Sequence, residues 1–215
     1  MSNVSRHVKS SRMSIERNSI SGYAVDAEHL IPAYEAIPAP NVFAHVLDFL
    51  PKRPSRIIEI GAGTGRDAAW LASQNHKLTA VEPVEPFREA GMLLHPSSLI
   101  RWVDDRLPYL PHILESQETF DLVLLVSVWQ HLTPEERPVS MVNLSKLLSS
   151  CGRVIMSIRH GPGSADRECF PATASETIDL ARQSGLKILS QRSAESVQAK
   201  NRLAGVTWTW LVLSK

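Results

Sequence analysis

Three glycines at alternate positions, Gly61, Gly63 and Gly65, are the residues of this sequence best suited to bind a ligand. Glycine has no Cβ, so a turn built from it lets the backbone come close to a bound molecule. An acidic residue, Glu59, precedes the turn and a basic residue, Arg66, follows it. The spacing differs from the dinucleotide fingerprint G-x-G-x-x-G, which needs a third glycine at position 66. The pattern predicts a ligand site and disfavours a nicotinamide oxidoreductase.

Acidic residues also end the next two predicted strands. Glu82 lies about twenty residues beyond the glycine turn, where a carboxylate can accept hydrogen bonds from both hydroxyls of a ribose. Asp104 and Asp105 end the following strand. Ligands of open parallel sheets bind beyond the carboxyl ends of the strands, so we expect these acids to meet the glycine turn. The alternative for Glu82 is a solvated acid at a strand end.

Two histidines after later strands are the candidate catalytic residues. His131 follows the most apolar run of the chain, and His160 follows Arg159 at the end of another strand. An unperturbed histidine titrates near neutral pH, so either ring can act as a general base. His131 can equally cap or pack the helix expected near Thr133. Arg159 can bind a carboxylate or phosphate of a substrate.

Seven predicted strands position these residues. They span residues 56–60, 77–82, 99–104, 120–128, 152–159, 186–192 and 206–214. The first five are separated by segments long enough for crossover helices, which predicts a doubly wound, mostly parallel α/β sheet. The segment between the last two strands, 193–205, has no strong helical pattern and is expected to be a loop. A hairpin with an antiparallel last strand should therefore close the sheet.

The N-terminal region is predicted to lie outside the sheet. Residues 1–20 are rich in Ser and Arg and lack the apolar segment of a secretory signal, so we expect a flexible tail. A transit peptide and a tail that orders over a ligand are the alternatives. Residues 27–37 and 42–50 have apolar residues at helical spacing and are expected as helices of a lid, residues 21–50. Residues 21–215 should form a single domain.

Composition limits the possible partners. The chain of 215 residues has 23 Lys and Arg against 22 Asp and Glu, which argues against an extended nucleic-acid surface. No apolar run approaches the roughly 20 residues of a membrane span. Two cysteines without metal-like spacing indicate reduced thiols and no metal site. We expect a cytoplasmic protein, monomeric or homodimeric, with no nucleic-acid or membrane partner.

The run from Glu59 to Gly65 resembles the first motif of class I S-adenosylmethionine-dependent methyltransferases. The acid that ends the second strand, the aspartate pair before a Leu-Pro, and Phe120-Asp121 at the start of the fourth strand follow in the order of that family. The resemblance covers residues 56–159 and implies that family's fold, a seven-stranded sheet with an antiparallel last strand.

The resemblance also implies S-adenosylmethionine as the cofactor. The glycine backbone would lie against its methionine part and ribose, and Glu59 would orient the turn and the cofactor's amino group. One aspartate, Asp104 in preference to Asp105, would accept from the adenine amino group. The expected cofactor-binding residues are Glu59, Gly61, Ala62, Gly63, Gly65, Arg66, Glu82, Pro83, Asp104, Asp105, Ser127 and Val128.

The expected reaction is methyl transfer to an oxygen or nitrogen of a small molecule. A sulfonium-bound methyl group is already electrophilic, so the protein mainly aligns a nucleophile and excludes water. A base, His131 or His160, is needed only where the nucleophile must lose a proton. The candidate acceptor contacts are Tyr23, Trp129, Arg159 and His160. A protein or RNA methyltransferase and a non-catalytic cofactor-binding regulatory module are the alternatives.

Overall fold

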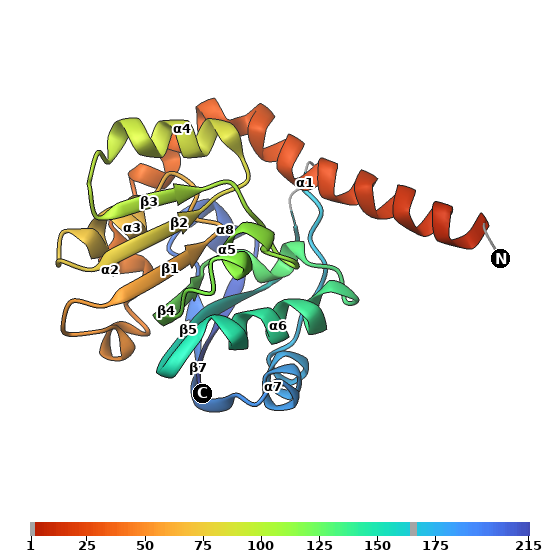
Figure 1. Cartoon of the computed structure of the whole chain (residues 1–215). Coiled ribbons are helices and arrows are strands. Elements are labelled where there is room, and N and C mark those ends of the chain that lie inside the picture. Colours follow the sequence, from red (N-terminus) through yellow and green to blue (C-terminus); the bar gives the residue numbers. More distant parts are fainter. Residues whose placement is uncertain (1–2, 164–166) are drawn as a thin grey trace.

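The computed structural model describes residues 3–163 and 167–215, and the side chains of helix α1 from Ser19 onward. Within this part, seven strands form one sheet in the order β3-β2-β1-β4-β5-β7-β6 (Figure 1). β7 is antiparallel to both of its neighbours, and the other pairs are parallel. The strands are β1 (Arg56–Ile60), β2 (Lys77–Val81), β3 (Ile100–Val103), β4 (Phe120–Leu125), β5 (Leu148–His160), β6 (Lys187–Glu195) and β7 (Thr207–Ser214). The predicted fold class, with its closing hairpin, is confirmed.

Helices cover both faces of the sheet. Apolar side chains of α5, α6 and α7 pack on one face, and those of α2 and α3 pack on the other. The helices are α1 (Asn3–Glu35), α2 (Ala39–Val42), α3 (Arg66–Ala72), α4 (Glu85–Leu94), α5 (Pro111–Glu115), α6 (Glu136–Leu147), α7 (Ala174–Gln183) and α8 (Ala199–Leu203), with 3-10 turns η1 (Leu47–Phe49) and η2 (Trp129–His131). The crossover helices expected between the first five strands are present as α3 to α6.

The central strands are apolar on both faces because each face carries a helix layer. Along β4, Leu122 and Leu124 pack toward α2 and α3, while Val123 and Leu125 pack toward α5, α6 and α7. All four side chains are almost completely buried. This two-residue alternation explains why the strand reads as a continuous apolar run rather than as a polar–apolar pattern.

The N-terminal region differs from the prediction. Residues 3–20, expected as a flexible tail, belong to α1, which also contains most of the helix expected at 27–37. No glycine or proline interrupts residues 3–21, so nothing local breaks the helix. The N-terminal half of α1 extends away from the sheet, and its C-terminal half lies beside α4 (Figure 1).

The helix predicted over 42–50 is wrong. The helical turn of α2 ends at Val42, and η1 follows after a turn. Phe43 and Val46 are both fully buried, with the Phe43 ring stacked on Trp70. Tertiary packing therefore takes precedence over the helical spacing of the sequence. The segment 193–205 also differs, because β6 continues to Glu195 and α8 occupies part of the expected loop.

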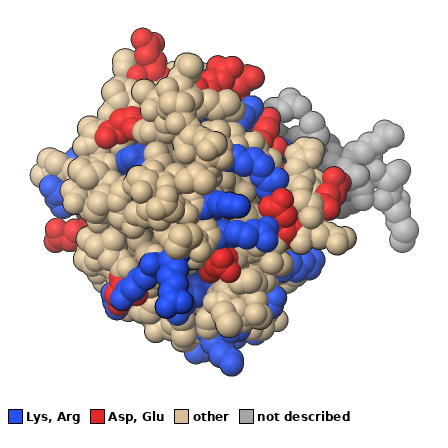
Figure 2. Space-filling view, turned by 60° about the vertical axis from the view of Figure 1, so that its left-hand side comes forward, with Lys and Arg blue, Asp and Glu red and all other residues tan. Residues whose placement is uncertain are grey.

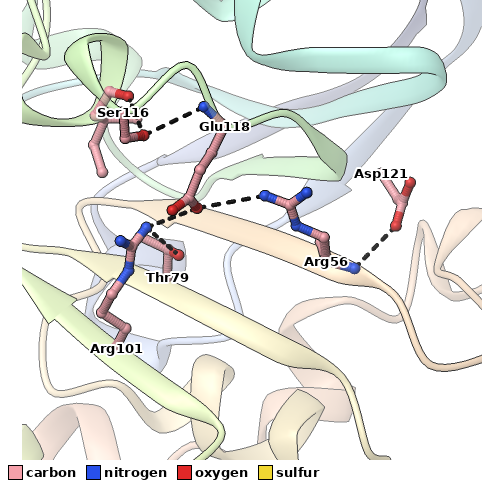
Figure 3. Close-up of polar contacts among 7 residues, drawn as sticks. Arg56, Thr79, Arg101, Ser116, Glu118 and Asp121 are labelled. Carbon is pink, nitrogen blue, oxygen red and sulfur yellow. Dashed lines mark hydrogen bonds and ion pairs between the residues drawn. The ribbon is translucent and has the colours of Figure 1, made fainter.

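Polar contacts join the amino-terminal ends of three strands. The backbone N–H of Arg56 donates to the Asp121 carboxylate at 2.9 Å, and Glu118 accepts from Arg101 at 2.9 Å and from Arg56 at 3.4 Å (Figure 3). These side chains are partly exposed, so each ion pair contributes at most about 1 kcal/mol. Ligands of parallel sheets bind beyond the carboxyl ends of the strands. These contacts lie at the opposite end of the sheet, away from that position.

Gly91 is the point at which α4 packs most tightly on the sheet. A Cβ at this position would overlap the Trp102 ring and the Thr64 carbonyl oxygen. Overpacking costs about 1–3 kcal/mol, more than the roughly 1 kcal/mol that alanine gains over glycine in a helix, so Gly91→Ala should lower the free energy of unfolding. Urea denaturation measures this. Met92→Ala, at a half-exposed position of the same helix, should stay within about 0.5 kcal/mol of wild type, and an equal effect of both changes would contradict the packing argument.

Candidate functional site

The carboxyl end of the sheet opens into a cavity of about 1020 Å³. Its walls come from α1, the glycine turn after β1, the ends of β2, β4 and β5, and the β6–β7 hairpin with α8. This is the switch-point position at which open parallel sheets bind ligands. Most of the sequence-predicted site residues line it: Tyr23, Glu59, Gly61, Ala62, Gly63, Arg66, Glu82, Pro83, Asp105, Ser127, Val128, His131 and Arg159.

The glycine turn is fixed by the strand beside it. The backbone N–H groups of Gly61 and Ala62 both donate to the Val81 carbonyl, at 2.8 and 3.0 Å. Gly61 has a φ of 72°, and a Cβ there would overlap the side chain of Val128. Gly63 has a φ of 56°, and a Cβ there would meet only a ring carbon of Tyr34 at 3.9 Å. Gly63 therefore turns its bare backbone toward the open space of the cavity.

Glu82 holds the glycine turn and faces the cavity. Its carboxylate accepts from the N–H of Gly63 at 2.7 Å and from the N–H of Val84 at 2.8 Å. The side chain is buried, and burial raises the pKa of Glu82 to about 7. A carboxylate has about four acceptor positions, so two remain for hydroxyl donors of a ligand.

Glu59 is a second buried carboxylate, beneath the turn. One of its oxygens, Oε2, has no hydrogen-bond partner, and burial, followed by the charge of Asp67, raises the pKa of Glu59. Arg66, the first residue of α3, binds Asp67 through two hydrogen bonds of 2.7 and 2.9 Å. It also donates to the Tyr34 carbonyl of α1 at 2.9 Å. The unpartnered Glu59 oxygen is an acceptor that a ligand ammonium group can satisfy.

At the end of β3, the structure brings Asp105 to the cavity rather than Asp104, the preferred candidate. Asp105 lines the cavity, and its carboxylate accepts from the backbone N–H groups of Arg106 and Ile113. Asp104 is exposed and forms an ion pair of 3.3 Å with Arg88. The strand ends at Val103, so strand alternation no longer decides which aspartate turns inward.

His131 lines the cavity from η2. Its Nδ1 lies 2.8 Å from the Glu168 carbonyl oxygen, and its Nε2 lies 2.9 Å from the Tyr23 hydroxyl. Burial lowers the pKa of His131, so the ring is neutral at physiological pH. The ring therefore carries a basic lone pair, as a general base requires.

Besides Asp104, three predicted residues do not line the cavity. Trp129 is fully buried against α7, where its indole N–H donates to Thr177 at 3.1 Å. The His160 ring lies 2.8 Å from the Thr209 hydroxyl, and Gly65 is the left-handed residue at the start of α3. Successive side chains of a strand point to opposite faces. Because Arg159 faces the cavity, the next residue, His160, points away from it.

The contacts that attach α1 to the site could not be predicted from the sequence. Glu35 accepts from the Thr64 hydroxyl and pairs with His95 at 3.1 Å. Arg167 pairs with Asp26 at 2.8 Å. These partners lie far apart along the chain, so no spacing pattern in the sequence indicates them.

The residues fit S-adenosylmethionine. Gly63 leaves open space beside the turn, Glu82 keeps two acceptor positions, and Glu59 has an unpartnered buried oxygen. Glu59 would hold the ammonium group, Glu82 the ribose hydroxyls, and the region near Asp105 the adenine. Over the described ranges, no cluster of His, Cys, Asp or Glu is arranged to hold a metal ion, and no helix is long and apolar enough to cross a membrane.

Residues 58–156 match the family model described as a methyltransferase domain. This match covers the strands and turns that hold every cofactor contact proposed above. The chain carries a class I S-adenosylmethionine-dependent methyltransferase domain. A curated relative of this methyltransferase, an uncharacterized methyltransferase of Bacillus mycoides strain KBAB4, is 24% identical over 160 residues, which cover 73% of this chain and 70% of the relative.

Solved structures share the fold of this methyltransferase. The 1,6-didemethyltoxoflavin-N1-methyltransferase of Burkholderia thailandensis, crystallised with 1,6-didemethyltoxoflavin and S-adenosylhomocysteine, has a TM-score of 0.71 and 22% identity, covering 95% of this chain and 89% of its own. Magnesium protoporphyrin IX methyltransferase of Synechocystis, with bound S-adenosylmethionine, has a TM-score of 0.62 and 14% identity, covering 82% and 77%.

Proposed function

We propose that this methyltransferase transfers the methyl group to an oxygen or nitrogen atom of a small organic acceptor. The observation that carries the proposal is the size of the cavity, about 1020 Å³. Pockets for one drug-sized ligand measure about 300–1,000 Å³. The cavity lies at the upper end of this range and its lining extends from the glycine turn to the β6–β7 hairpin, so an acceptor would fit beside the cofactor.

The acceptor would occupy the part of the cavity next to that hairpin, which we call the tryptophan pocket and define by Trp208, Trp210, Ala194, Arg159 and Ser157. Trp208 pairs with Arg159 on β5 and with Ala194 on β6, and Trp210 pairs with Ser157, so these side chains lie on one face of the sheet. Trp208 and Trp210 both line the cavity, and indole rings are flat and mostly apolar. The pocket suits an acceptor with a flat, apolar body.

The chemistry of transfer needs little from the protein. When bound, S-adenosylmethionine supplies an electrophilic methyl group. The tryptophan pocket would hold the nucleophile in line with that group, and α1 would exclude water. Neutral His131 would receive a proton from an acceptor that must lose one.

Two further observations support a small acceptor. Lys and Arg side chains are intermixed with Asp and Glu on the face that Figure 2 shows, and the net charge of the chain is +1. An extended basic surface is typical of nucleic-acid-binding proteins. The structural relative from Burkholderia thailandensis is named for a small molecule, 1,6-didemethyltoxoflavin.

Trp208→Ala tests the proposal. After a screen of phenols and nitrogen heterocycles with radiolabelled methyl donor, this change should raise the KM of the best acceptor at least tenfold, because about 1.4 kcal/mol of apolar contact corresponds to tenfold in affinity. The affinity for S-adenosylhomocysteine should change less than about threefold. Leu189→Ala, on the same hairpin but outside the cavity, is the control. Methyl transfer to protein or RNA, with none to small molecules, would contradict the proposal.

A further inference from the structure

Tyr23 joins α1 to the candidate base. Its hydroxyl lies 2.9 Å from His131 Nε2, and the two rings meet edge to face with centroids 5.4 Å apart. The Tyr23 ring also packs on Phe87 at 5.9 Å, and the Arg167 guanidinium lies over it at 4.8 Å. These contacts fix the position of the hydroxyl at the cavity wall.

The partners of His131 determine the direction of the hydrogen bonds. The Glu168 carbonyl can only accept, so Nδ1 carries the ring hydrogen and donates it at 2.8 Å. Nε2 therefore carries the lone pair and accepts from the Tyr23 hydroxyl, with the Gln130 amide a further neighbour at 3.2 Å. Both ring nitrogens are thus engaged by protein groups. An acceptor in the cavity would have to displace Tyr23 to reach the lone pair directly.

We propose that Tyr23 is a catalytic residue that relays the acceptor's proton to His131. The inference rests on the proposed function, because it concerns the same acceptor and the same cavity. The Tyr23 oxygen donates its hydrogen to His131 and keeps lone pairs to accept one from the acceptor. Tyr23 lines the cavity, so its oxygen is within reach of a bound molecule.

The relay balances in atoms and charge. The acceptor's lone pair forms the new bond to the methyl carbon as the carbon–sulfur bond breaks, and the bonding electrons stay on sulfur. The acceptor's proton passes to the Tyr23 oxygen, and the proton already on Tyr23 passes to His131 Nε2. The positive charge of the sulfonium is thereby replaced by that of an imidazolium, which loses its proton to solvent.

The surroundings of Tyr23 keep its hydroxyl protonated between turnovers and stabilise negative charge on its oxygen during proton transfer. Burial, followed by the neighbouring Tyr34, raises the pKa of Tyr23, so the hydroxyl remains protonated between turnovers. The charge of Arg167 acts in the opposite direction and stabilises negative charge that develops on the Tyr23 oxygen during transfer. Arg167 also pairs with Asp26 on α1, and Cys169 lies near the same ring of His131.

Nuclear magnetic resonance of the full chain saturated with S-adenosylhomocysteine tests the hydrogen bond without any acceptor. Long-range ¹H–¹⁵N spectra, assigned with His131→Gln, should show His131 with hydrogen on Nδ1. Tyr23→Phe should raise the pKa of His131, because it removes a donor that favours the neutral ring. Tyr34→Phe, on the same helix without a contact to His131, should not shift it. An unshifted His131 in Tyr23→Phe would overturn the proposal.

Turnover tests the relay itself. For an acceptor whose nucleophile carries a proton, Tyr23→Phe should lower kcat about 100-fold, within the range for general acid–base catalysis, with KM and cofactor affinity changed less than about threefold. For an acceptor that reacts through a bare lone pair, such as a pyridine nitrogen, the same variant should lose less than about threefold. Equal losses for both acceptors, or no loss for either, would overturn the relay. An enzyme that methylates no small molecule would refute the proposed function, while the His131 titration would still decide the hydrogen bond.

Discussion

Gly63→Val should abolish measurable binding of S-adenosylhomocysteine. A side chain at this position would project into the cavity, where only a Tyr34 ring carbon lies within 4 Å of the added Cβ. The cofactor would lose its place beside the turn and the N–H to Glu82 would be disturbed. We expect an affinity loss of at least 100-fold, about 2.7 kcal/mol, measured by calorimetric titration.

The control for this change must separate backbone strain from obstruction, because Gly63 has a φ of 56° and valine is strained there. Gly185 has a φ of 78° and no atom within 4 Å of an added Cβ, and it does not line the cavity. Gly185→Val should therefore lose stability in a similar way while keeping cofactor affinity. Retained affinity in Gly63→Val would show that the glycine turn does not contact the cofactor.

The cofactor half of the site could be predicted from sequence because its determinants are local. Glu59, Gly61 and Gly63 lie within five consecutive residues, and Glu82 directly follows the adjacent strand. Strand order in a doubly wound sheet brings such positions together without further information. The structure differs from the expectation at Asp104, because the strand ends at Val103 and its alternation stops there.

The acceptor half could not be predicted in the same way. His160 was a candidate base and Trp129 a candidate acceptor contact, but one binds Thr209 and the other is buried against Thr177. Tyr23 and His131 are 108 residues apart in the sequence. They meet because α1 lies over the cavity. Contacts of this kind depend on tertiary packing, which leaves no spacing pattern in the chain.

The segment before the sheet was mispredicted for related reasons. Composition indicated a flexible tail at 1–20, whereas helix propensity without a breaker allows α1 to continue through it. Periodicity indicated a helix over 42–50, whereas burial of both Phe43 and Val46 needs a turn between α2 and η1. Composition and periodicity describe only local conformational tendencies. Packing on the sheet determines which conformation a segment adopts.

Affinity for the cofactor should depend on pH through Glu82. Burial raises the pKa of Glu82 from its ordinary 4.5 to about 7 in the free protein. A raised carboxyl pKa means that the folded state favours the protonated form. The contribution of Glu82 to the free energy of unfolding is therefore complete below pH 4.5 and is lost as the pH rises to about 7. By linkage, the free energy of unfolding falls by about 3 kcal/mol over this range.

Binding should reverse this preference, because two ribose hydroxyls that donate to the carboxylate stabilise its charged form. Glu82 would then release its proton when the cofactor binds. Affinity for S-adenosylhomocysteine should be highest above pH 7. Below pH 7 it should fall by up to tenfold for each pH unit, because one proton competes with binding. Calorimetry between pH 5.5 and 8, in buffers of different ionisation enthalpy, measures both the affinity and the released proton.

Two variants assign the effect to this carboxylate. Glu82→Gln should bind more weakly at pH 8 and show little change with pH, because the amide does not titrate and accepts at only one atom. Asp179→Asn removes an exposed carboxylate outside the cavity and should retain the wild-type pH profile. A wild-type affinity that stays constant from pH 5.5 to 8 would show that Glu82 only holds the glycine turn. A slope that persists in Glu82→Gln would instead point to Glu59 or Asp67, two other buried carboxylates whose pKa is raised by burial.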